Sequence, residues 1–355
     1  MTSVLDSATA LPHLGFDWPQ GPDFADIISR EWLVTNGRGG YASGTVATCN
    51  TRRYHGLFVP SLPKHGRMVL LARLVEQAHV DGHLFQLSTE EHTDGEGLQD
   101  GIGRLRSFYL DGLIPVWEYD LGPSRLRRKL MMVHGENTLF VAWEHVSGPE
   151  IHLRLRPFPV ARHHDRPIPG AAYDPIVRIQ EGRLEMQATP DAPVMRMRLL
   201  AKCAMPFVAL SQSSQPLLYR TERARGYDYT ERQYSPGYFE CSLGPGELLS
   251  LGVTTDDWWV LDREPEKSFE LERERERKLL MRASEEARGG VPARLVLAAD
   301  QFIIDPMRPK DDAWARSIGQ DARSVIAGYH WFTDWGRDTM ISLEGLTLST
   351  GRYRE

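Results

Sequence analysis

Ile151-His152-Leu153-Arg154-Leu155-Arg156 alternates apolar and polar side chains without a break. Successive side chains of a β-strand point to opposite faces of a sheet, so this alternation predicts a strand with one buried face. The turn signal Ser147-Gly148-Pro149 comes directly before it, and the strand-like stretch 138–145 precedes that turn. The segment therefore predicts two consecutive strands joined by a tight turn.

The same pattern extends in both directions, from about residue 31 to residue 257. Asp81-Gly82 lies between the strand-like stretches 69–78 and 84–87 and is a strong hairpin signal. Many strands with frequent turns and few helical patterns predict a mainly β fold, a large antiparallel β-sandwich. The remaining strand candidates are 116–121, 125–133, 183–187, 194–200, 238–242 and 248–253.

The pattern changes at Pro265. Residues 267–287 carry dense mixed charge, with Glu274 and Lys278 at the helical i, i+4 spacing. This predicts a solvated helix that bridges two domains, the alternative being a disordered charged linker. Four apolar side chains favour packing of a helix, namely Phe269, Leu271, Leu279 and Leu280.

Two further helices are expected after the charged segment. Gly289-Gly290 ends the charged helix, residues 293–304 form a mostly apolar helix, and a last helix begins near Thr339 and ends at Gly351. The predicted domains are therefore 1–264, the β-sandwich; 265–292, the charged helical linker; and 293–355, a second domain that begins with helices.

Composition excludes several classes of protein. The net charge is −6, which argues weakly against nucleic acid and anionic membranes as partners. The three cysteines (Cys49, Cys203 and Cys241) form neither a disulfide framework nor a zinc spacing. Without a secretory signal or a membrane span, the chain is expected to be cytoplasmic. No P-loop, Gly-x-Ser-x-Gly or Cys/His cluster is present, so no cofactor or metal is expected.

Aromatic, acidic and basic side chains are concentrated in one short segment, Tyr329-His330-Trp331-Phe332-Thr333-Asp334-Trp335-Gly336-Arg337-Asp338. Aromatic rings bind the apolar faces of sugars, whereas Asp and Arg bind their hydroxyls. The alternative is an Asp338 helix cap with an arginine salt bridge and two core tryptophans. The candidate substrate-binding residues are Trp331, Asp334, Trp335, Arg337 and Asp338.

Two other groups of residues have simpler interpretations. Gly37, Gly39 and Gly40 resemble a dinucleotide loop, but tight turns between opening strands of the sandwich fit their context better. The nearby Arg52-Arg53-Tyr54-His55 predicts an internal polar network, or side chains that face a ligand or another domain. His163-His164-Asp165 suggests a metal, but adjacent histidines of an extended chain point apart, so a surface loop is expected.

Taken together, residues 31–59, 298–304 and 328–351 resemble the bacterial and archaeal glycogen debranching enzyme family, of the amylo-α-1,6-glucosidase type. The resemblance implies a sandwich joined by a helical linker to an (α/α)6 barrel, of which residues 293–355 are the beginning. It also implies hydrolysis of α-1,6-linked glucose at the branch points of glycogen or a branched α-glucan. Oligomeric state is left open.

The resemblance also implies roles for the candidate residues. Arg337 and Asp338 would hold hydroxyls of the sugar in the cleaved subsite, with Asp334, Trp335 and Trp331 lining the same pocket. Inverting glycosidases need an acid and a base roughly 6.5–9.5 Å apart. Both are expected on later loops of the barrel, so no catalytic residue is assigned here and the chain alone is expected to be inactive. The alternative is Asp338 as a catalytic carboxylate.

Three functions remain open from the sequence. The first is a glucan debranching hydrolase, of which this chain is a fragment. The second is a glucan-binding or interaction module without catalysis. The third is another enzyme of the same architecture, such as a glucoamylase, trehalase or glycoside phosphorylase.

Overall fold

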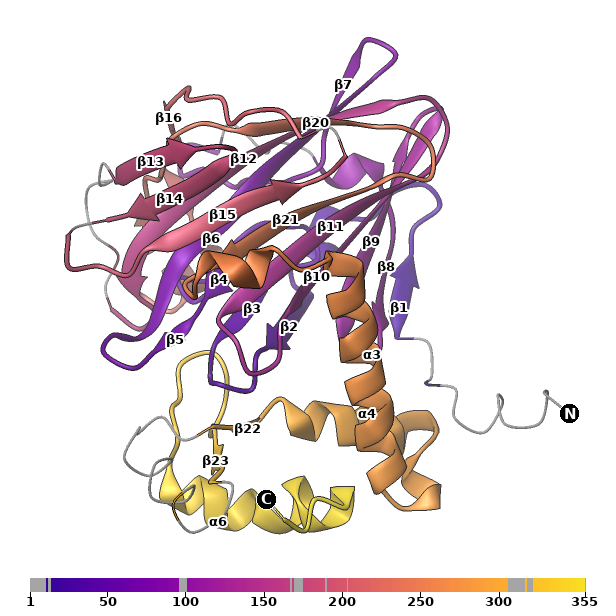
Figure 1. The fold of residues 1–355 in the computed structure, drawn as a ribbon, viewed down its shortest axis with the longest axis vertical. Helices are drawn as coiled ribbons and strands as arrows, with labels where there is room; N and C mark the ends of the chain where they lie inside the picture. Colours follow the sequence, from indigo (N-terminus) through magenta and orange to yellow (C-terminus); the bar gives the residue numbers. More distant parts are fainter. Residues whose placement is uncertain are drawn as a thin grey trace, which may run out of the picture.

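The structure is a computed structural model that describes residues 11, 14–95, 101–166, 168, 175–188, 190–202, 204–305, 317 and 322–354. Two large antiparallel sheets form its β domain (Figure 1). The nine-stranded sheet has the order β1 (Gly15–Asp17), β8 (Leu105–Asp111), β9 (Ile114–Leu121), β10 (Ser124–Met132), β11 (Thr138–Ser147), β21 (Leu248–Thr254), β15 (Met195–Leu200), β14 (Arg183–Gln187) and β13 (Ile176–Gln180).

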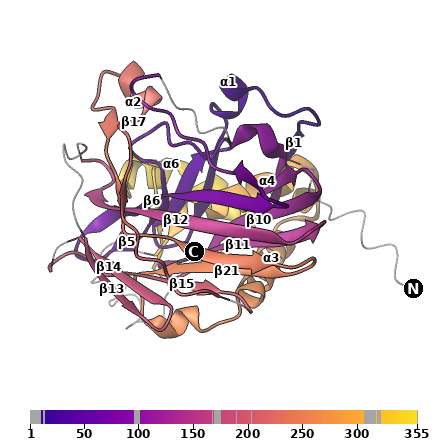
Figure 2. The ribbon, with the colours of Figure 1, turned by 90° about the horizontal axis from the view of Figure 1, so that it is seen from above.

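The second sheet has eight strands. Its order is β2 (Glu31–Thr35), β3 (Tyr41–Thr45), β4 (Gly56–Val59), β6 (Gly66–Val80), β12 (Ile151–His163) and β20 (Phe239–Leu243), with β5 (Ser61–Leu62) and β7 (His83–Gln86) beside β6. Short elements complete the domain: α1 (Phe24–Ile27), α2 (Arg220–Ala224), β16 (Gln212–Ser213), β17 (Leu217–Leu218), β18 (Thr230–Glu231) and β19 (Tyr234–Ser235). Figure 2 shows α2 and the linker helix α3 (Pro265–Arg282) on different sides of the β domain.

The strand predictions are confirmed. Strand β12 begins at the quoted alternation, and its Leu153 lies opposite Ala78 of β6. It runs past Pro159, where the ladder shifts register, because a bulge tolerates the missing N–H of proline. The predicted hairpin joins β6 to β7, with Asp81 and Gly82 both at positive φ.

The core lies between the two sheets and includes the buried ion pair of Glu76 with Arg128. Trp117 and Trp143 are fully buried there. Glu76 of β6 accepts hydrogen bonds from Arg128 Nε at 2.9 Å and from Trp143 Nε1 at 2.8 Å. Because both donors come from the nine-stranded sheet, Glu76 links one sheet to the other across the core.

The linker is helical and packed, as predicted. Phe269 of α3 covers the outer face of the nine-stranded sheet together with Val260 and Leu261. Leu279 and Leu280 pack on α4 (Gly290–Asp300). Two boundaries differ from the prediction: α3 ends at Arg282 rather than at the glycine pair, and Gly290 begins α4.

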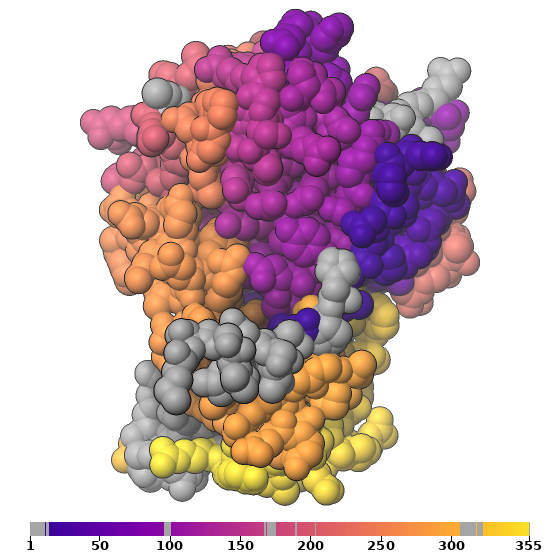
Figure 3. Space-filling view, turned by 90° about the vertical axis from the view of Figure 1, so that its right-hand side faces the viewer, coloured from indigo at the N-terminus to yellow at the C-terminus, as the bar shows by residue number. Residues whose placement is uncertain are grey.

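The prediction of an apolar helix over 293–304 was wrong at the C-terminal end of the helix. Helix α4 stops at Asp300, and β22 (Ile303–Ile304) pairs with β23 (Ser324–Val325) instead. An apolar run is compatible with either structure, so the periodicity could not separate them. Helix α6 (Gly336–Leu346) and a 3₁₀ turn (Leu348–Thr350) follow, the helix starting earlier than Thr339. Figure 3 shows this C-terminal part, in orange and yellow, as a smaller mass below the β domain.

Helix α6 exposes much of its apolar side. Met340 and Ile341, for example, are 69% and 78% exposed. Cys49 and Cys241 are buried and take part in no disulfide, and Cys203 lies outside the described residues. Among the residues described, no helix has the length and apolar character needed to cross a membrane.

A buried carboxyl joins α3 to the β domain and predicts a pH-dependent stability. Glu276 Oε1 accepts the Leu113 N–H at 2.9 Å, and burial raises the Glu276 pKa to about 7, with Glu272 adding repulsion. The folded chain therefore holds this proton more tightly than the unfolded chain, so stability falls as pH rises from about 4.5 through 7. Glu276→Gln removes the charge and is expected to raise the free energy of unfolding by roughly 3 kcal/mol at pH 8 and by little at pH 5.

Urea unfolding at the two pH values measures this effect. Glu270→Gln on the same helix is the control, because the Glu270 side chain is largely exposed and should change stability by under about 1 kcal/mol at either pH. An equal gain for Glu276→Gln at pH 5 and pH 8 would contradict the raised pKa.

Candidate functional site

The quoted aromatic motif forms a closed loop between β23 and α6. An isolated bridge pairs Ile326 with Asp334, and the Ala327 N–H donates to Thr333 O at 3.0 Å. Inside the loop, the Phe332 N–H donates to Gly328 O at 3.0 Å. In Figure 1 this loop is the yellow segment that rises from the C-terminal part toward the lower edge of the β domain. The backbone of the motif is therefore fixed by its own hydrogen bonds.

A buried arginine of the β domain holds this loop against the sheet. Arg67 of β6 is almost fully buried and donates to His330 O at 2.8 Å and also to Phe332 O. No carboxylate forms an ion pair with Arg67 within the described part of the chain, and burial lowers the pKa of its guanidinium. Its two charge-assisted bonds thus go to the backbone of the motif, which they position against the sheet.

The side chain of His330 also anchors the loop to the β domain. Its ring Nε2 lies 2.5 Å from Ser43 Oγ of β3, and its ring packs 5.3 Å from Tyr41 and 5.5 Å from His55. Burial lowers the His330 pKa to about 3, so the ring is neutral near pH 7. His55 pairs with Glu31 at 3.4 Å. The stretch 52–55 thus takes part in an internal polar network that also faces the C-terminal segment, combining both sequence interpretations.

Trp331 and Trp335 lie on the outside of the loop. Trp331 packs 5.7 Å from the buried ring of Tyr54, Phe332 lies 5.8 Å from Trp331, and Trp335 lies 6.1 Å from Phe332. The side chains of Trp331, Phe332 and Trp335 are 37%, 41% and 50% exposed. They are therefore not core tryptophans, which removes part of the helix-cap alternative.

The predicted polar residues lie next to these rings. Asp334 Oδ2 accepts from Ser324 Oγ at 3.3 Å, and Arg337 is exposed in the first turn of α6. Asp338 is in the same turn but is not the cap, because the N-cap is Trp335. Its Oδ2 is buried and accepts no hydrogen bond from any described residue. Among the described contacts, Arg337 and Asp338 form no salt bridge with one another, so both side chains keep hydrogen-bonding capacity.

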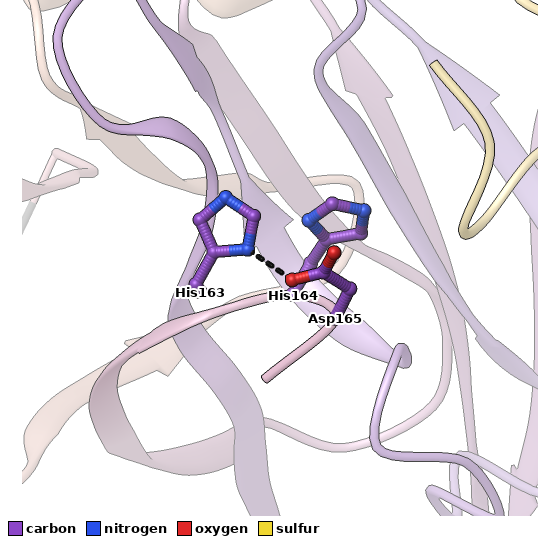
Figure 4. A group of neighbouring side chains, drawn as sticks. All are labelled: His163, His164 and Asp165. Atoms are coloured by element: carbon purple, nitrogen blue, oxygen red, sulfur yellow. Dashed lines mark hydrogen bonds and ion pairs between the residues drawn. The ribbon is translucent and has the colours of Figure 1, made fainter. Parts of the chain in front are cut away.

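The three residues His163, His164 and Asp165 form the only metal-like cluster in the part of the chain that the structure describes. Figure 4 shows His163 Nδ1 bonded to Asp165 Oδ1, at 2.5 Å. The surface-loop prediction is wrong for His164, which is buried and has its pKa lowered to about 3 by burial and by Arg67. His164 Nδ1 donates to Arg67 O at 3.3 Å, which leaves its lone pair on Nε2. The hydrogen bond between His163 and Asp165 already uses one candidate ligand atom of each residue, and we assign no metal.

Sequence reasoning missed the residues of the β domain that hold the motif. Arg67, Ser43 and Tyr54 precede the motif by more than 200 positions, and no periodicity links them to it. A single unusual signal was available, an arginine at the start of a long apolar strand. The burial of Arg67 could be recognised only once the C-terminal segment was seen to pack against it.

The structure thus combines a two-sheet β domain with an aromatic loop that bears Asp and Arg at the start of a helix. Residues 30–250 match the family described as "Glycogen debranching enzyme N terminal", and residues 297–355 match "Amylo-alpha-1,6-glucosidase". The first match covers more than half of the chain, so the chain belongs to the glycogen debranching enzyme family. The family resemblance of the sequence is thereby confirmed.

Two solved structures give weaker likenesses. A bacterial glucoamylase in complex with acarbose has 9% sequence identity and a TM-score of 0.35, over 72% of this chain and 36% of that one. A protein described as a kojibiose phosphorylase from the human microbiome has 8% identity and a TM-score of 0.38, over 81% and 43%. This chain thus spans less than half the length of either. No curated protein matches it.

Proposed function

We propose that this chain supplies the sugar-binding part of a glycogen debranching α-1,6-glucosidase. The observation that carries the proposal is the row of exposed rings of Trp331, Phe332 and Trp335 on a loop fixed by Arg67. Rigid, exposed rings next to unpaired carboxylate and guanidinium groups suit a ligand with apolar faces and hydroxyl edges. A branched α-glucan such as glycogen has this chemistry, and both family matches support it.

In this proposal, Arg337 and Asp338 bind hydroxyls of the glucose unit that is cleaved. The unpaired Oδ2 of Asp338 accepts a sugar O–H, and Arg337 donates to a neighbouring hydroxyl. Trp331 and Trp335 stack on sugar rings, and Asp334 holds the loop through Ser324. The acid and base of an inverting hydrolysis are other carboxyl groups, which lie roughly 6.5–9.5 Å apart across the scissile bond. No cofactor takes part.

The role of Asp338 can be tested by assaying the complete gene product with a branched limit dextrin as substrate. Asp338→Asn is expected to lower kcat/KM by about tenfold or more, because a charge-assisted hydrogen bond is lost, and to leave the shape of the pH–rate profile unchanged. Loss of one limb of that profile would show that Asp338 is itself the acid or the base.

The same assay separates the competing functions. A hydrolase releases glucose without added phosphate, whereas a phosphorylase requires it. The 355-residue chain on its own is expected to bind the dextrin and release no glucose. Glucose release by that chain would contradict the assignment of the acid and base to other residues, and binding without any hydrolysis by the gene product would favour a glucan-binding module.

A further inference from the structure

Exposed rings continue from the sugar-binding loop onto the β domain. The Arg225 guanidinium, at the end of α2, lies 5.5 Å from the Trp331 ring and 5.3 Å from the Tyr227 ring. Together with the contacts from Trp331 through Phe332 to Trp335, this gives one uninterrupted row. We call Tyr227, Arg225, Trp331, Phe332 and Trp335 the aromatic strip. Residues about 100 positions apart in the sequence thus form a single surface.

The far end of the strip is open to solvent and has unused polar groups. Tyr227 is 49% exposed, comparable to Trp335 at the other end. Within the described residues, the side chains of Arg225 and Tyr227 make no hydrogen bond or ion pair, only the contacts between guanidinium and ring. Their N–H and O–H donors are therefore available to a ligand.

Buried residues support this end of the strip. The guanidinium of Arg53 lies 5.1 Å from the Tyr54 ring and 5.3 Å from the Tyr227 ring, and it donates to the Tyr54 hydroxyl at 3.1 Å. Glu222 of α2 is fully buried, with its carboxylate 4.0 Å from Arg53 Nε. Tyr54 in turn lies under Trp331. The contacts thus form a connected layer beneath the strip, which holds Tyr227 and Trp331 in place.

We propose that the aromatic strip binds several consecutive glucose units of an α-glucan chain, with Arg225 and Tyr227 forming its distal subsite. A purely apolar partner would leave the Arg225 guanidinium desolvated without an acceptor, which costs free energy. A glucan gives each ring an apolar sugar face and gives Arg225 hydroxyl acceptors. The strip ends beside Asp334 and Asp338, so a chain lying along it leads to the sugar subsite. This proposal rests on the proposed function and extends its substrate to a chain of sugars.

Calorimetric titration of the chain with maltose and with maltoheptaose tests the strip. Tyr227→Ala and Arg225→Ala are each expected to weaken maltoheptaose binding by about two- to fivefold, the size of an exposed contact between a cation and a ring. Neither substitution should change maltose binding, because two sugars fill only the end beside Asp338. Tyr229→Ala is the matched control: Tyr229 is 40% exposed in the same segment and has no ring contact with the strip.

The possible outcomes separate this proposal from the function on which it rests. Unchanged maltoheptaose affinity in both variants, with Asp338→Asn still weakening it, would overturn the distal subsite and leave the proposed function standing. An equal loss in Tyr229→Ala would also overturn it, as an effect on the segment as a whole. If the wild-type chain binds neither sugar, the proposed function fails, and the distal subsite fails with it.

Discussion

Replacing Asp300 by alanine is expected to lower the free energy of unfolding by about 3–5 kcal/mol, the usual cost of removing one partner from a buried ion pair. The Asp300 carboxylate at the end of α4 accepts from Arg275 at 2.6 Å and from Arg352 at 2.5 Å. These two arginines hold its pKa below the ordinary value for aspartate. Asp300 thereby joins the linker helix, α4 and the C-terminal turn. Without it, two guanidinium groups face one another with no common acceptor.

Urea unfolding measures the effect, and Asp262→Ala is the matched control. Asp262 also pairs with an arginine at 2.6 Å, Arg198, but its side chain is 51% exposed. An exposed pair contributes little, so the control should lose under about 1 kcal/mol. Similar losses in the two variants would contradict the structural role of Asp300.

Arg67→Ala is the second change with a large expected effect. It removes two charge-assisted bonds to the motif backbone, one buried bond to the His330 carbonyl and one part-buried bond to the Phe332 carbonyl, and leaves both carbonyls without these donors. The expected cost is roughly 3 kcal/mol in the free energy of unfolding, together with weaker limit-dextrin binding under conditions where the variant is still folded. The tryptophan emission should shift, because Trp331 and Trp335 lie on the loop that is released.

Two further variants show whether Arg67 acts by positioning the loop. Arg67→Lys keeps the charge but has no planar fork to reach both carbonyls, so it should restore stability more than it restores binding. Arg125→Ala, on an exposed position of β10, should change neither. Full dextrin affinity in a folded Arg67→Ala chain would contradict the positioning role.

The strands could be predicted because their signals are local. Alternation at 151–156 and the Asp81-Gly82 turn depend on neighbouring residues alone, and both were confirmed. The end of α4 could not be predicted, because Ile303 and Ile304 continue the apolar pattern of the helix. Their strand depends on pairing with Ser324 and Val325, some 20 residues later.

The site was only partly accessible from the sequence for the same reason. The motif 329–338 was visible as an unusual density of rings and charges, and its tryptophans lie exposed in the structure. The roles of Glu76, Arg67 and Arg225 depend on tertiary placement, because the local sequence does not reveal whether a charged side chain faces the core, the C-terminal segment or solvent. Their roles became visible only through their partners, Arg128, the loop backbone and Trp331.

Titration of the chain with a branched limit dextrin, followed by intrinsic tryptophan fluorescence, tests the sugar-binding role of the motif most directly. We expect a saturable fluorescence change in the wild-type chain. Trp335→Ala should reduce the amplitude of this change, and Asp338→Asn should weaken the dextrin affinity by about tenfold or more, whereas Glu344→Gln, on an exposed position of α6, should alter neither. No saturable change in the wild type, or equal affinity in Asp338→Asn and wild type, would contradict the sugar-binding role.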